Sequence, residues 1–200
     1  MVRWLPACAL VFLAACQPRG GVDVGELRGW PLDPPVAKPD FVLATTEGDS
    51  FDFQKETDGF VTLLFFGFTN CPDVCPLHMA NIDAAMEKLP PNVASRIKVV
   101  FVATDVERDH PERVREWLDH FSTDFIGLVG DLDEINQIER GIGLGASYRE
   151  EWPDGGYGMA HAAAVLAFTT DNLAHVSYPF GIRQVDWAFD LPRLVGDPGP

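Results

Sequence analysis

Apolar runs of strand length alternate along the chain with segments whose apolar residues recur at helical spacing. Residues 60–68 (FVTLLFFGF) and residues 97–104 (IKVVFVAT) are almost continuously apolar, which is typical of strands that are buried on both faces of a sheet. The pattern predicts one helix from Pro76 to Leu89 and another within residues 109–121, where Pro111 falls in the first turn. Both helices follow a buried strand, so we expect them to pack on the same sheet.

Shorter elements are predicted on either side of this central part. Residues 41–53 indicate two short strands around a turn, residues 132–142 have weaker helical spacing, and residues 161–178 indicate a hairpin that turns at residues 170–172. A closing helix is predicted in residues 184–195, and Pro192 is expected to shorten it. The element order resembles that of a thioredoxin-like α/β fold, which has a central mixed sheet flanked by helices, here with an N-terminal strand pair.

The N-terminus has the pattern of an export signal. One basic residue, Arg3, precedes an apolar run from Trp4 to Ala15 that is too short to span a bilayer as a helix. The segment Leu-Ala-Ala-Cys that ends at Cys16 resembles the lipobox of bacterial lipoproteins. This resemblance implies a signal peptide in residues 1–15 and a lipid-modified cysteine that anchors the protein to a membrane, facing the periplasm or the outer face of the cell membrane. An ordinary cleaved signal peptide or a short uncleaved anchor are the alternatives.

Composition and charge limit the classes of partner. Residues 16–40 are rich in Gly and Pro and are expected to form the lipidated N-terminus and a flexible tether for a single domain of residues 41–200. The formal net charge is −15. A protein this acidic is a poor candidate for binding nucleic acid, whose phosphates need a Lys and Arg surface.

Two cysteines remain for the folded domain, Cys71 and Cys75, because Cys8 leaves with the signal and Cys16 carries the lipid. They follow the first buried strand directly, in the segment FFGFTNCPDVCP. A disulfide scaffold would use more cysteines and would seldom close so small a loop. A helix that starts at this point would stabilise thiolates through its free N–H groups, so the position favours reactive sulfur.

The spacing of the pair separates the possible chemistries. Three residues lie between the cysteines, whereas thioredoxin-type reductases have two. Residues four apart on a helical turn face the same way, so the two sulfurs can form a disulfide or bind one soft metal ion together. Pro72 and Asp73 could instead hold an irregular loop. Zinc normally takes four ligands, and two thiolates with one imidazole suit monovalent copper better.

The segment GFTNCPDVCP resembles the signature of the Sco/SenC family of copper-binding assembly factors for cytochrome c oxidase. The segments VATDVERDHPERVREWLDHF and FIGLVGDLDEI resemble further parts of that family, so the similarity runs from residue 38 to residue 195. The resemblance implies that His161, in YGMAHAAAVLAF, is the third copper ligand. Family members commonly have Asp before this histidine and Ser after it, where this chain has Ala160 and Ala162.

Other residues near the expected site have two interpretations each. His78 lies three residues beyond Cys75 and either approaches the metal or is a satisfied helix histidine. Asp105 ends the second buried strand and either supports the site or caps a turn. Phe68 belongs to the core or shields the metal. The remaining histidines are expected at the surface or at helix ends, and they are His110, His120 and His175.

Two functions fit the same residues. The resemblance implies a copper metallochaperone that binds the ion through Cys71, Cys75 and His161 and passes it to the binuclear copper centre of cytochrome c oxidase subunit II, or to another exported cuproprotein. The alternative is a thiol-disulfide oxidoreductase whose catalytic pair, Cys71 and Cys75, reduces the cysteines of the recipient. A thiol peroxidase is disfavoured because nothing else marks a peroxide pocket. The domain has no further cysteine, so a separate thiol reductase is expected as a partner.

Overall fold

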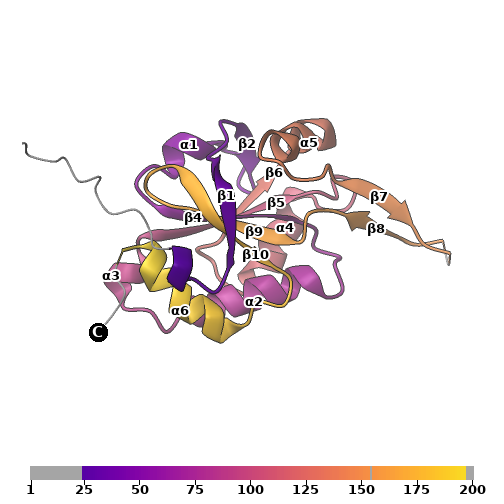
Figure 1. Cartoon of the computed structure of the whole chain (residues 1–200). Helices are drawn as coiled ribbons and strands as arrows, with labels where there is room; N and C mark the ends of the chain where they lie inside the picture. Colours follow the sequence, from indigo (N-terminus) through magenta and orange to yellow (C-terminus); the bar gives the residue numbers. More distant parts are fainter. Residues whose placement is uncertain (1–23, 154, 197–200) are drawn as a thin grey trace, which may run out of the picture.

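The computed structural model describes residues 24–153 and residues 155–196. They form an eight-stranded mixed sheet with helices on both faces, and a separate two-stranded hairpin (Figure 1). The strand order across the large sheet is β1-β10-β9-β4-β5-β6-β2-β3. The strands are β1 (Trp30–Ala37), β2 (Val42–Thr45), β3 (Ser50–Asp52), β4 (Val61–Gly67), β5 (Ile97–Ala103), β6 (Ile126–Val129), β7 (Tyr148–Glu151), β8 (Tyr157–Ala160), β9 (Ala164–Phe168) and β10 (Leu173–Pro179).

The helices form two layers around the sheet. The helices are α1 (Phe53–Glu56), α2 (Val74–Met86), α3 (Pro91–Ala94), α4 (Pro111–Asp119), α5 (Leu132–Gly141) and α6 (Gln184–Leu194), and a 3-10 turn, η1, covers Val24–Glu26. One apolar core lies between the sheet and helices α2, α4 and α6. A second core lies between the opposite face of the sheet and helices α1 and α5. This is the thioredoxin-like arrangement that the element order predicted.

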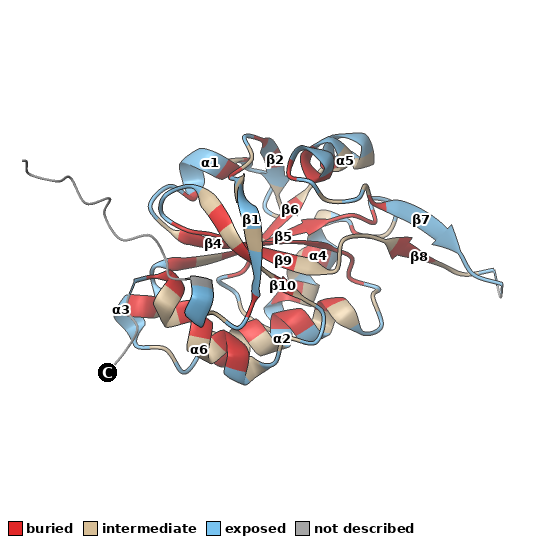
Figure 2. Ribbon diagram, in the orientation of Figure 1, coloured by how far each residue is buried: buried red, intermediate tan, exposed pale blue. Residues whose placement is uncertain are grey.

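Strand β4 lies at the centre of the sheet, parallel to β5 on one side and antiparallel to β9 on the other. All of its residues are buried (Figure 2). Its side chains alternate between the two cores, with Leu63 and Phe65 on the side of α2 and with Leu64 and Phe66 on the side of α5. The prediction of two strands buried on both faces is confirmed for β4 and β5. An apolar run without alternation places apolar side chains in both cores.

The other predicted elements are present with shifted ends. Helix α2 begins at Val74, so Pro76 lies in its first turn, where a proline costs no hydrogen bond. The hairpin β9–β10 turns where expected, and Asn172 there has a positive φ of 62°. Helix α6 continues through Pro192 to Leu194, so the expected shortening is wrong. Only two residues of the helix follow Pro192, and the buried side chains of Leu191 and Leu194 hold this last turn on the core.

The edge strand β1 occupies a segment that sequence analysis assigned to the flexible tether. Its residues pair with β10, and the register shifts between Pro31 and Val36, where prolines interrupt the ladder. An edge strand tolerates this because one side of it has no partner that requires an N–H group. Just before β1, the backbone N–H groups of Arg28 and Gly29 donate to the carboxylate of Asp190 in α6, at 2.9 to 3.1 Å.

The expected signal peptide and Cys16 lie outside the described residues. Within residues 24–153 and 155–196, no helix is long and apolar enough to cross a membrane.

The hairpin β7–β8 projects from the body of the protein and was not predicted (Figure 1). Strand β7 is exposed along its whole length (Figure 2). At the turn end of the hairpin, where Tyr157 pairs with Glu151, the ring of Tyr157 contacts two guanidinium groups, those of Arg108 at 3.7 Å and Arg149 at 3.8 Å. Strand β8 ends at Ala160, which pairs with Tyr148 and directly precedes His161.

Candidate metal centre

The two cysteines lie at the carboxyl end of β4, where the chain turns into α2. Cys71 is in the turn before the helix, and its N–H donates to the carbonyl oxygen of Phe68 at 3.2 Å. Cys75 is the second residue of α2, and its N–H points at the sulfur of Cys71 with a separation of 3.5 Å. Cys71 is half-buried and Cys75 is fully buried, and both are free thiols. The start of α2 thus directs the N–H of Cys75 at the sulfur of Cys71 and buries the sulfur of Cys75.

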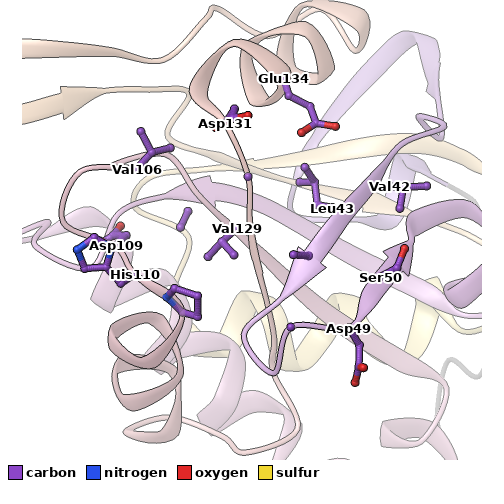
Figure 3. Close-up of a pocket in the computed structure, with 15 residues that line it drawn as sticks. Val42, Leu43, Asp49, Ser50, Val106, Asp109, His110, Val129, Asp131 and Glu134 are labelled. Carbon is purple, nitrogen blue, oxygen red and sulfur yellow. The ribbon is translucent and has the colours of Figure 1, made fainter.

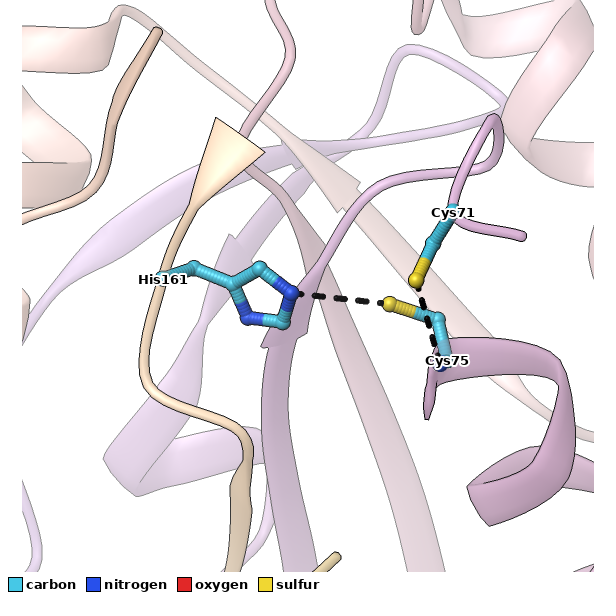
Figure 4. A group of neighbouring side chains, drawn as sticks. All are labelled: Cys71, Cys75 and His161. Atoms are coloured by element: carbon cyan, nitrogen blue, oxygen red, sulfur yellow. Dashed lines mark hydrogen bonds between the residues drawn. The ribbon is translucent and has the colours of Figure 1, made fainter. Parts of the chain in front are cut away.

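His161 approaches the same point from the opposite side (Figure 4). It lies between β8 and β9, and its Nε2 is 3.7 Å from the sulfur of Cys75. Its other ring nitrogen, Nδ1, is 3.1 Å from the carbonyl oxygen of Ala162. Because a carbonyl oxygen only accepts, Nδ1 carries the proton in this arrangement and the lone pair of Nε2 faces the sulfurs. The two sulfurs and one imidazole nitrogen all lie within 4.8 Å of one another.

The electrostatics of the pair divide it into one thiolate and one thiol. The pKa of Cys71 is lowered to about 3, chiefly because the Cys75 thiol donates a hydrogen bond to its sulfur. The pKa of Cys75 is raised, first because burial disfavours its charged form and then because Cys71 lies beside it. A soft cation bound by both sulfurs would therefore displace a proton from Cys75.

Aromatic rings and a glycine shape the space around the three side chains. The rings of Phe65 and Phe68 meet the His161 ring edge to face, with centroids 6.0 and 5.6 Å apart. Gly67, the last residue of β4, lies directly against the sulfur of Cys75, because a Cβ at this position would be 2.9 Å from that atom. The absence of a side chain at Gly67 therefore makes room for the buried sulfur.

The turn that carries Cys71 is held by a carboxylate that the sequence did not single out. Asp109, which is buried, accepts from the N–H of Thr69 at 3.0 Å and from its hydroxyl at 2.6 Å. Arg113 of α4 also donates to that hydroxyl, at 3.2 Å. Burial raises the pKa of Asp109, although its bonds with Thr69 oppose the shift. In the sequence, Asp109 is marked only by its place just before a predicted helix, and that place is equally typical of a residue that caps the helix.

Two residues for which the sequence left two interpretations, His78 and Asp105, lie outside the three-atom cluster. His78 is buried, and its Nε2 lies 3.3 Å from the carbonyl oxygen of Ala163. Asp105 is also buried and accepts from Arg108 and from the hydroxyl of Tyr157, the latter at 3.1 Å. Asp105 therefore joins the loop after β5 to Tyr157, the first residue of β8. Neither side chain takes part in the cluster of possible metal ligands found in the described part of the chain.

A pocket of about 570 Å³ lies elsewhere, between the β2–β3 hairpin and the starts of α4 and α5 (Figure 3). Its polar side chains include those of His110, Asp131 and Glu134. None of the three clustered side chains lines it, so the pocket is separate from the metal centre.

Fold and site together define a thioredoxin-like protein with two cysteines and one histidine gathered at the carboxyl end of the central strands. The chain belongs to the SCO1/SenC family, because the SCO1/SenC family model matches residues 31–195. The resemblance found in the cysteine segment is thereby confirmed. The match begins at the start of β1, which agrees with the structure in placing this strand within the domain.

Individual relatives agree with this assignment. The chain is 38% identical over 87 residues to Protein SCO1 homolog 1, mitochondrial, of Arabidopsis thaliana, a match that covers 44% of this chain and 26% of that protein. It is 36% identical over 99 residues to the SCO2-like protein RC0895 of Rickettsia conorii, covering 50% of this chain and 47% of the relative. The chain thus spans less than half the length of these two curated relatives.

Solved structures match over most of the chain. The structure of Bradyrhizobium japonicum ScoI with copper bound has a TM-score of 0.69 at 28% identity, and the match covers 79% of this chain and 99% of that one. The solution structure of apo Sco1 from Thermus thermophilus has a TM-score of 0.68 at 30% identity, covering 86% and 94%.

Proposed function

We propose that this protein binds one monovalent copper ion through Cys71, Cys75 and His161 and delivers it to the binuclear copper centre of cytochrome c oxidase subunit II or of another exported cuproprotein. The observation that carries the proposal is the convergence of two sulfurs and one imidazole nitrogen within 4.8 Å. These three residues come from sequence positions up to 90 apart, so local chain geometry alone does not bring them together.

The donor set suits monovalent copper. Thiolates are soft ligands and select soft ions over the hard divalent ones. Within the residues that the structure describes, no fourth Cys, His, Asp or Glu atom joins the cluster, whereas structural zinc sites are normally four-coordinate. The similar protein from Bradyrhizobium japonicum, which has been solved with copper bound, supports copper as the metal.

Delivery requires that the ion be reachable. Cys71 and His161 are partly exposed, so ligands of a recipient can reach the ion and replace them one by one. Lipidation at Cys16, which the first residues of the sequence indicate, would hold the domain at the periplasmic side of a membrane where an oxidase subunit is assembled.

Copper binding is tested on the domain with the thiols reduced and with them oxidised. The reduced protein should bind about one ion per molecule, the capacity of one three-ligand site. Cys71→Ser and Cys75→Ser should each lose tight binding, because a hydroxyl is a poor ligand for a soft ion. The air-oxidised protein should bind essentially no monovalent copper, since a disulfide provides no thiolate. Equal tight binding in the oxidised protein, or undiminished affinity in either variant, would contradict the site assignment.

A thiol-disulfide oxidoreductase is the second candidate, and the unequal environments of the two sulfurs favour it. The half-exposed Cys71 has a lowered pKa and can attack a disulfide of the recipient as a thiolate, which forms a mixed disulfide and releases one recipient thiolate. The buried Cys75 then loses its proton and attacks the sulfur of Cys71, which releases the second recipient thiolate. The recipient is reduced and the pair is oxidised, so an external dithiol reductase must restore it.

His161→Ala separates the two functions. Imidazole is a metal ligand but not part of the redox couple, so this variant should retain copper poorly and still form and break the disulfide. Copper retention, disulfide exchange with a small dithiol, and oxidase assembly in cells are the three measurements. Loss of assembly together with intact exchange favours the chaperone, whereas normal assembly without copper retention favours the oxidoreductase.

A further inference from the structure

The segment that carries His161 is held by few contacts of its own. Residues 161–163 lie after the last pair of the β7–β8 hairpin, at Ala160, and before the first pair of β9 with β10, at Ala164. They are therefore outside the ladders of both sheets. The residues that flank His161 are alanines, so the ring is oriented by the backbone carbonyl of Ala162 rather than by a neighbouring polar side chain. The direction of that carbonyl depends on how this short segment is fixed.

His78 fixes the segment from the helix that carries Cys75. It lies three residues after Cys75 in α2, so the two side chains are neighbours along one face of the helix. Its side chain is 2% exposed, and Nε2 is 3.3 Å from the carbonyl oxygen of Ala163. Since that oxygen only accepts, Nε2 carries the proton and donates. The ring of Phe65 packs on the imidazole, with centroids 5.1 Å apart.

Together these contacts form a closed path around the metal centre. The path runs from Cys75 along one turn of α2 to His78, across the hydrogen bond to Ala163, and back along the backbone to His161. The final gap is the 3.7 Å between His161 Nε2 and the sulfur of Cys75, which is where an ion would be held. In this path the hydrogen bond of His78 is the tertiary contact that joins the helix to the histidine segment.

We propose that His78 is a positioning residue of the copper site, which sets the distance and orientation of His161 relative to Cys75 through its hydrogen bond to the carbonyl of Ala163. The inference rests on the proposed copper function and adds a residue that is not a ligand. Burial lowers the pKa of His78, so the imidazole is neutral near pH 7 and donates from Nε2 without bringing a charge to the centre.

A purely structural role for His78 predicts a different result, and a matched variant separates the two. Asn81, one turn further along α2, makes a bond of the same kind, since its side-chain amide donates to the carbonyl oxygen of Ile182 at 3.1 Å. That bond joins α2 to the loop between β10 and α6, which carries no candidate ligand. His78→Leu and Asn81→Leu therefore each remove one hydrogen bond from α2 to a backbone carbonyl, but only the first bond leads to His161.

The experiment measures the monovalent copper affinity of the reduced protein by competition with a chromogenic copper chelator, alongside urea unfolding. His78→Leu should weaken copper affinity about tenfold, the lower end of what removal of a residue supporting a metal ligand costs. Asn81→Leu should leave the affinity at the wild-type value while lowering stability similarly. His78→Gln, whose amide can donate from a similar position, should restore the affinity. Wild-type affinity in His78→Leu, or equal losses in both leucine variants, would overturn the proposal.

A second measurement on the metal-free protein keeps the inference separate from the proposed function. NMR order parameters for the amides of Ala162 and Ala163 should fall in His78→Leu and remain unchanged in Asn81→Leu. If wild type and Asn81→Leu bind no copper, the proposed function fails, whatever the amides show. If copper binds but the amides of His78→Leu remain as ordered as in wild type, the positioning role of His78 fails while the function stands.

Discussion

Replacing Gly67 by alanine tests how closely β4 supports the buried sulfur of Cys75. An added Cβ would lie 2.9 Å from that sulfur, 2.9 Å from a ring carbon of Phe101 and 3.1 Å from a ring carbon of Phe65. Ordinary contacts of such an atom begin at 3.4 Å. The sulfur must therefore move away by about 0.5 Å if it takes the whole adjustment. The aromatic rings are fully buried and leave little room for the strand to move instead.

Two effects follow from this crowding. Overpacking of a dense core costs about 1–3 kcal/mol of unfolding free energy. A metal site must hold its ligands within about 0.5 Å of the productive geometry, so a displacement of this size reaches the limit at which binding suffers. We expect Gly67→Ala to weaken copper binding at least about tenfold, which is a loss of about 1.4 kcal/mol.

Gly127→Ala is the matched control. Gly127 lies in β6, and a Cβ there would meet side-chain atoms of Thr46, Leu118 and Val114 at 2.8 to 3.0 Å, which is the same degree of crowding without a sulfur. Both variants should lose similar stability in urea unfolding, but only Gly67→Ala should lose copper affinity in chelator competition. Undiminished affinity in Gly67→Ala, or an equal loss of affinity in Gly127→Ala, would refute the reasoning from the close approach of β4 to Cys75.

Two further predictions concern the thiol pair and the bonds between Asp190 and the segment before β1. Because the pKa of Cys71 is lowered to about 3, its alkylation by iodoacetamide should remain fast as the pH falls from 7 and should decline only as the pH approaches that value, where the thiolate is protonated. Mass spectrometry should then find one alkylated cysteine, Cys71, and a rate that already falls below pH 7 would contradict the lowered pKa. Asp190→Ala removes the acceptor of the Arg28 and Gly29 amides and of the Tyr178 hydroxyl, which should cost about 2–4 kcal/mol of stability and expose the segment before β1 to trypsin. Asp190→Asn retains an acceptor and should lose less, whereas unchanged protection of Arg28 in the alanine variant would show that other contacts hold this segment.

The sequence was sufficient for the central elements and for the cysteine pair. Strands β4 and β5 are continuous apolar runs, a pattern that leaves few alternatives to burial on both faces. The spacing of Cys71 and Cys75 after such a strand is a local signal, and both residues lie where it predicted. His161 depended on the family resemblance, because a lone histidine among alanines carries no pattern of its own.

Elements whose stability comes from distant contacts were missed. Strand β1 contains three prolines, which resemble a tether in sequence, but it pairs with β10 and the residue before it, Gly29, is bound to Asp190. The β7–β8 hairpin has an all-exposed strand without alternation, and its Tyr157 contacts Arg108, a residue distant in the sequence, as well as Arg149. The contact from His78 to Ala163 joins residues 85 positions apart, so no local pattern could indicate it.

The difference in depth between the two sulfurs would give the proposed exchange of copper ligands a direction. For an ion held by these three atoms, an incoming donor can approach only from the side of Cys71 and His161, because Cys75 is fully buried beneath the start of α2. Those two bonds would then be the first to be replaced, and Cys75 would be the last residue to release the ion. The Cys75 sulfur must recover a proton when it lets go, since burial disfavours its thiolate without a metal. Uptake of that proton would therefore accompany departure of the metal from Cys75.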